Sequence, residues 1–153
     1  MKKEIIIDII TALLVLLFSY TAFSKFLDHG NFAVLLYKSP LFTFKPLAIL
    51  VSWFVPVMES VIVLGLLTSF RLKALYASVI LLFLFELYIM GMVLSGLHLP
   101  CSCGGVIAQL SWKAHIPFNA FFIMITCYAI RLCRIKTIFS SGLKTARKDL
   151  SRA

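Results

Sequence analysis

Long apolar runs separated by short polar stretches dominate the chain. Four of them cover about residues 5–26, 47–67, 74–97 and 116–132. Each is close to the roughly 20 residues that a helix needs to cross about 30 Å of hydrocarbon. The runs are continuously apolar and do not alternate, which favours helices over barrel strands. Helices also satisfy their own backbone hydrogen bonds inside lipid. The pattern predicts an all-α integral membrane bundle of four transmembrane helices.

Shorter segments complete the predicted organisation. Residues 31–37 are apolar enough to lie along a membrane surface, and Ser39-Pro40 ends that segment because proline cannot continue a helix. We assign residues 5–132 to a four-helix transmembrane domain and residues 133–153 to a basic cytoplasmic tail. The tail is either an amphipathic surface helix or a disordered basic segment.

The start of the chain has a second interpretation. Lys2 and Lys3 precede the first apolar run, and Ala22-Phe23-Ser24 resembles the cleavage site of a signal peptide. The apolar run is longer than the usual core of a signal peptide. We therefore favour a retained transmembrane helix over a cleaved leader.

Composition strengthens the membrane interpretation. Hydrophobic residues make up 61% of the chain and charged residues 14%, against about 45–50% and about 25% in soluble domains. A soluble domain of 153 residues could not bury so much apolar surface. A soluble globular domain, a disordered chain and a secreted disulfide scaffold are therefore excluded as classes.

The positive charges predict the orientation. Seven of the 15 Lys and Arg residues lie in the last 23 positions, and the formal net charge is +9. With a cytoplasmic N-terminus, 11 of these residues face the cytoplasm and four face outward, as the positive-inside rule requires. We predict a multi-pass protein of the bacterial inner membrane with both termini cytoplasmic and outer loops at residues 27–46 and 96–115. The basic tail is expected to contact anionic membrane lipid and no nucleic acid, because no base-reading motif accompanies it.

Two cysteines in the second outer loop carry the strongest chemical signal. The sequence there is Cys101-Ser102-Cys103-Gly104-Gly105. On the outer side of the membrane disulfides persist, and the glycines permit the bent backbone that cysteines at i and i+2 need to pair. Such a small ring is expected to be strained, which raises the reduction potential and favours a transferable disulfide. Cys101 and Cys103 are therefore the candidate catalytic pair for thiol–disulfide exchange.

Other roles for these cysteines stay open. They are free thiols without a role, they form a bridge to another chain, or they bind copper or zinc together with His98, His115 and Met92. No standard zinc spacing is present, so we assign no metal ligands. His98 and His115 otherwise read as interfacial loop residues.

Three ionisable residues fall in or beside the apolar runs. Glu59 and Glu86 lie inside the second and third runs, and Lys25 ends the first. Each charge costs about 2.5–3.5 kcal/mol to insert at the centre of a membrane helix, so both carboxyl groups should face the bundle interior. With Lys25 they either carry a proton or orient a small ligand such as a quinone, or they only hold the bundle together through hydrogen bonds between helices.

Several motifs resemble one membrane family. They are Tyr20–Lys25, Pro56–Glu59 and Leu64–Leu67 in the first two runs, and Cys101–Gly105 after the third. With these motifs the chain resembles the MauE-like family (methylamine utilisation protein MauE), within the broader DoxX-like membrane proteins. The resemblance implies a four-helix membrane protein associated with redox maturation. It also implies a thioredoxin-like, MauD-type partner and an exported substrate such as methylamine dehydrogenase, whose small subunit needs disulfides.

The function that we predict is participation in thiol–disulfide exchange during disulfide formation or maturation of exported proteins. The chain would then be a component of a thiol–disulfide oxidoreductase system in methylamine metabolism. One alternative is a DoxX-like assembly subunit that binds partners without chemistry. Another is a membrane protein that handles copper or zinc.

Overall fold

The computed structural model describes residues 2–39, 44–95 and 112–150. Regular structure within these ranges is entirely helical, with no strand. The helices are α1 (Lys2–Leu27), α2 (His29–Lys38), α3 (Lys45–Leu67), α4 (Arg71–Leu94) and α5 (Trp112–Leu150).

Four of the described helices are long and apolar enough to cross a membrane: α1, α3, α4 and residues 115–135 of α5. Large apolar side chains such as Leu16, Leu64 and Met124 are exposed on the outside of the bundle. Such a surface suits a hydrocarbon environment, because a soluble protein rarely exposes large contiguous apolar patches. The predicted all-α, four-helix membrane bundle is confirmed.

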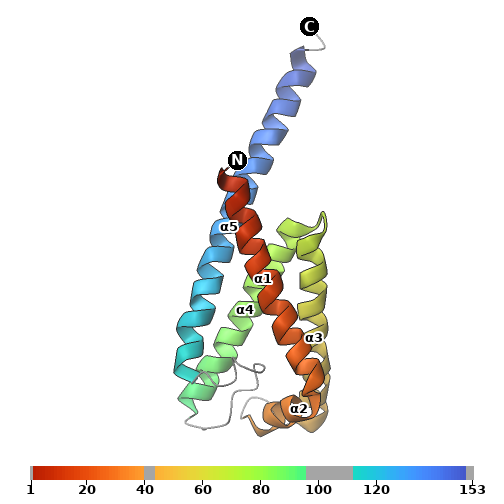
Figure 1. Cartoon of the computed structure of the whole chain (residues 1–153), viewed down its shortest axis with the longest axis vertical. Helices are drawn as coiled ribbons and strands as arrows, with labels where there is room; N and C mark the ends of the chain where they lie inside the picture. Colours follow the sequence, from red (N-terminus) through yellow and green to blue (C-terminus); the bar gives the residue numbers. More distant parts are fainter. Residues whose placement is uncertain (1, 40–43, 96–111, 151–153) are drawn as a thin grey trace.

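The start of α1 and the end of α5 lie toward the same end of the bundle (Figure 1). We call this the terminal end, and it also holds the connection between α3 and α4 at Thr68–Phe70. Helix α2, the end of α4 and the start of α5 lie at the opposite end, which we call the α2 end (Figure 1). This arrangement agrees with two termini on one side of a membrane, and the assignment of that side to the cytoplasm stays a prediction.

The start and the end of α5 differ from the sequence expectation, whereas the end of α2 agrees with it. Helix α5 begins at Trp112, ahead of the expected 116, and it continues without a break to Leu150. His115 therefore lies inside a helix and is buried, with 3% of its surface exposed. The prediction of His115 as an interfacial loop residue was wrong, because the first turn of α5 packs the histidine against the bundle. Helix α2 ends at Lys38, in agreement with the stop expected at Ser39-Pro40.

The apolar core is concentrated toward the terminal end. Leu14 and Phe18 of α1 pack with residues of α3, α4 and α5, and both are almost fully buried. Near the connection between α3 and α4, a Cβ atom at Gly65 would lie 2.9 Å from Cβ of Ala74. The two backbones therefore approach closely there, as small residues allow in membrane helices. Toward the α2 end, side chains of α3 and α4 instead line a cavity.

Candidate functional site

A buried ion pair joins α1 to α3 in the half of the bundle nearer the α2 end. The Nζ atom of Lys25 lies 2.8 Å from Oε1 of Glu59, and the two side chains are 4% and 0% exposed. The hydroxyl of Thr21 donates a second hydrogen bond of 3.1 Å to the same oxygen. Thr21 and Lys25 share one face of α1 because residues four apart lie one helical turn apart. The carboxylate thus receives both donors from a single helix.

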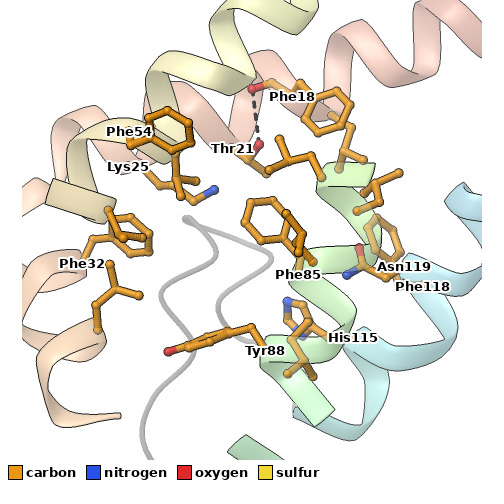
Figure 2. Close-up of a pocket in the computed structure, with 18 residues that line it drawn as sticks. Phe18, Thr21, Lys25, Phe32, Phe54, Phe85, Tyr88, His115, Phe118 and Asn119 are labelled. Atoms are coloured by element: carbon orange, nitrogen blue, oxygen red, sulfur yellow. Dashed lines mark hydrogen bonds between the residues drawn. The ribbon is translucent and has the colours of Figure 1, made fainter. Parts of the chain in front are cut away.

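Aromatic rings surround the Lys25 ammonium group on its other sides. Its Nζ lies 5.2 Å from the centroid of the Phe85 ring on α4 and 5.8 Å from that of Phe32 on α2. Cations within about 6 Å of a ring centroid are attracted to the ring face. An ammonium group has three donors, and the Nζ atom points into the space between Phe32 and Phe85 (Figure 2). Lys25 therefore presents a buried positive charge to that space.

The space is a cavity of about 350 Å³ lined by α1 to α5. Most lining side chains are aliphatic or aromatic, and the polar ones come from α1, α4 and α5: Thr21, Lys25, Tyr88, His115 and Asn119. A mostly apolar cavity with a few convergent polar groups is typical of small-molecule sites. Figure 2 shows Lys25 on one side of this cavity and His115 and Asn119 on another.

Two side chains that line the cavity also reach the outside of the bundle. Phe54 of α3 and Leu84 of α4 both line it, and they are 58% and 55% exposed. Both residues lie well inside candidate membrane spans. This part of the cavity wall therefore lies at the depth at which lipid chains surround a membrane-inserted bundle.

The structure separates the three ionisable residues singled out in the sequence. It brings Lys25 and Glu59 together as an ion pair. Glu86 of α4 makes no ion pair with a described residue and is not among the cavity-lining residues that these helices supply. Its Oε2 atom is buried without a hydrogen-bond partner in the described part of the chain, and so is Oε2 of Glu59.

Four cysteines bear on the sulfur chemistry that the sequence predicts. Cys101 and Cys103 lie outside the described residues, and so does His98 of the copper or zinc alternative. Searched on its own, the described part contains no group of three or more residues able to hold a metal ion. Cys127 is exposed on α5, and no disulfide joins it to Cys133 within that helix.

Sequence reasoning did not place four polar residues in the cavity wall, although it named His115 as a possible metal ligand. Thr21 had a readable signal, because it precedes Lys25 by one helical turn. Asn119 is a polar residue within the first turns of an apolar run, which is itself a reason to expect a buried role. Tyr88 and His115 gave no such signal, since tyrosine and histidine near the end of a span usually mark the membrane interface.

These features define a multi-pass membrane protein with an apolar cavity beside a buried ion pair. The family model described as "Methylamine utilisation protein MauE" matches residues 3–132. The chain therefore belongs to the MauE family, which confirms the resemblance seen in its motifs and associates it with methylamine utilisation. No curated protein and no solved structure matches the chain.

Proposed function

We propose that the protein takes part in thiol–disulfide exchange through Cys101 and Cys103 at the outer face of the bacterial inner membrane. The observation that supports this most is where the cysteine segment attaches. It joins α4 to α5, and the adjoining parts of these helices supply Tyr88, Ile89 and His115 to the cavity wall. The segment that contains Cys101 and Cys103 is therefore joined at both ends to helices that line the cavity.

The exchange moves one disulfide and two electrons. A thiolate of the reduced partner attacks one sulfur of the Cys101–Cys103 disulfide and forms a mixed disulfide, which the second thiolate of the partner then resolves. The partner is oxidised to a disulfide, and Cys101 and Cys103 are reduced to thiols. A thioredoxin-like, MauD-type protein is the expected carrier between this pair and the exported substrate. A lipid-soluble electron acceptor must then reoxidise the two thiols.

Paired cysteine variants test this proposal. Cells that lack the gene are complemented with the natural chain, with Cys101→Ser/Cys103→Ser, or with Cys127→Ser/Cys133→Ser. The measured quantity is the free-thiol content of exported proteins after alkylation. We expect it to rise in the first variant to the level of cells without the gene, and to stay at the natural level in the second.

Two results would overturn the proposal. If loss of the gene raises the free-thiol content but Cys101→Ser/Cys103→Ser does not, the protein is an assembly subunit without redox chemistry. If loss of the gene leaves exported thiols unchanged, thiol–disulfide exchange is not its function.

A further inference from the structure

We propose that the cavity lined by α1 to α5 binds a membrane-soluble quinone, with the Lys25 ammonium group donating a hydrogen bond to one carbonyl oxygen of the quinone ring. The binding site is argued from the described helices alone. Its use as the acceptor for electrons from the cysteine pair rests on the proposed function above.

The position of two lining residues favours a ligand from the hydrocarbon phase. Phe54 and Leu84 line the cavity, are more than half exposed and lie within candidate spans. We infer that a ligand dissolved in the membrane reaches the cavity beside these residues by lateral diffusion, whereas a water-soluble molecule would have to cross the apolar region.

The lining selects a flat ring. Aromatic side chains contribute from all five described helices: Phe18, Phe32, Phe54, Phe85, Tyr88 and Phe118. Aromatic faces and edges pack well against other flat conjugated rings. The volume of about 350 Å³ lies near the lower end of the range of about 300–1,000 Å³ for small-molecule sites. It suits a substituted ring better than the paired acyl chains of a phospholipid.

The polar groups select a ligand with oxygen acceptors. Lys25 is 4% exposed and has more donors than the single bond to Glu59 uses. An acyl chain has no acceptor to offer it, whereas a carbonyl oxygen accepts such a bond. Asn119, 8% exposed, lies on another side of the cavity (Figure 2). A quinone carries oxygens on opposite sides of its ring, so one molecule can meet polar groups on both sides.

A bound quinone supplies an acceptor for two electrons and two protons, which is what the oxidation of two thiols to one disulfide releases. The role of Lys25 is to orient the carbonyl oxygen and to stabilise the negative charge that develops on it. The role of Glu59 is to hold the ammonium group at the cavity wall through the 2.8 Å contact. Lys25 is thus a binding residue and Glu59 a positioning residue.

The test is binding of decylubiquinone to the purified full chain in lipid nanodiscs. We expect saturable binding at one quinone per chain. Val51→Phe adds a ring at a cavity-lining position and should weaken binding at least tenfold. Val61→Phe is the matched control, because it makes the same change at an exposed position of α3 outside the cavity lining. It should leave binding unchanged.

The Lys25 contact is tested separately. Lys25→Met should weaken binding about tenfold or more, the value expected for a hydrogen bond from a charged donor. Lys73→Met, at an exposed lysine of α4 near Phe70, should have no effect. If Lys25→Met does not fold, the pair Val51→Phe and Val61→Phe still decides where the quinone binds.

Several results would overturn the inference. One is the absence of saturable binding in protein whose helical spectrum is native. A second is binding by Val51→Phe as tight as that of the natural chain. A third is equal binding of decylcyclohexane, a probe without carbonyl groups, which would indicate a site for lipid chains. Cys101→Ser/Cys103→Ser should bind decylubiquinone normally, so failure of the exchange proposal and failure of this one are distinguishable.

Discussion

Replacing Lys25 by methionine is expected to destabilise the bundle strongly. The change leaves the carboxylate of Glu59, which is 0% exposed, without its ion-pair partner. At the observed 2.8 Å separation, an effective dielectric constant of about 20 gives an attraction of about 6 kcal/mol before the cost of desolvation. Removing one partner of such a buried pair typically costs about 3–5 kcal/mol. We expect Lys25→Met to lower the free energy of unfolding of the bundle by an amount in that range.

Further variants separate the effect of the buried charges on stability from the effect of side-chain shape. Glu59→Gln keeps an acceptor for Lys25 and Thr21 but leaves the buried ammonium group without its counter-ion, so it should also lower the free energy of unfolding by about 3–5 kcal/mol. The double variant Lys25→Met/Glu59→Leu buries no charge at these two positions. Its free energy of unfolding should lie within about 1 kcal/mol of that of the natural chain. Lys73→Met, which removes an exposed lysine from α4, serves as the control and should change stability by less than about 1 kcal/mol.

The assay is the free energy of unfolding in mixed micelles titrated with sodium dodecyl sulfate and followed by helical circular dichroism. Two results would refute the reasoning. One is a loss below about 1 kcal/mol for Lys25→Met, well under the range for a broken buried pair. The other is a double variant whose loss equals the sum of the losses of Lys25→Met and Glu59→Leu measured singly, because independent residues show no coupling.

Two further predictions concern the terminal end and use the same unfolding assay. Gly65→Ala should lower the free energy of unfolding by about 1–3 kcal/mol, because its new Cβ would lie 2.9 Å from a side chain of α4. Gly30→Ala is the control, because open space surrounds its Cβ, and it should not lower the free energy of unfolding. Equal effects of the two variants would contradict the close approach of α3 and α4. Arg71 donates to the buried hydroxyl of Thr11 and to the exposed carboxylate of Asp8. Asp8→Asn should therefore change the free energy of unfolding by only about 0–1 kcal/mol. Thr11→Val should lower it by about 1–3 kcal/mol. A larger loss for Asp8→Asn than for Thr11→Val would be inconsistent with the burial of the two side chains.

The membrane spans were predictable because hydrocarbon imposes one simple requirement. A helix in lipid must be apolar over about 20 residues, and that requirement can be read from the chain without knowing which helix packs on which. The helices at 45–67 and 71–94 begin and end within about three residues of the predicted runs. The family was predictable from local motifs, since these are short and contiguous.

The site was only partly predictable because it depends on how the helices pack. The cost of burying charge implied inward positions for Glu59 and Glu86, but it could not indicate which of them meets Lys25. That choice depends on α1 packing against α3, with Lys25 and Glu59 34 positions apart. The cavity was not predictable at all, because its wall gathers side chains from five described helices, each of which alone resembles any apolar span.

The central claim is that Cys101 and Cys103 form an exchangeable pair outside the cytoplasm. Its most direct test is labelling of whole cells with a membrane-impermeant maleimide, in a chain that also carries Cys127→Ser/Cys133→Ser. We predict that Cys101 and Cys103 are protected before treatment with a reductant and labelled after it. Labelling that is absent under both conditions, or that is the same with and without the reductant, would contradict the claim.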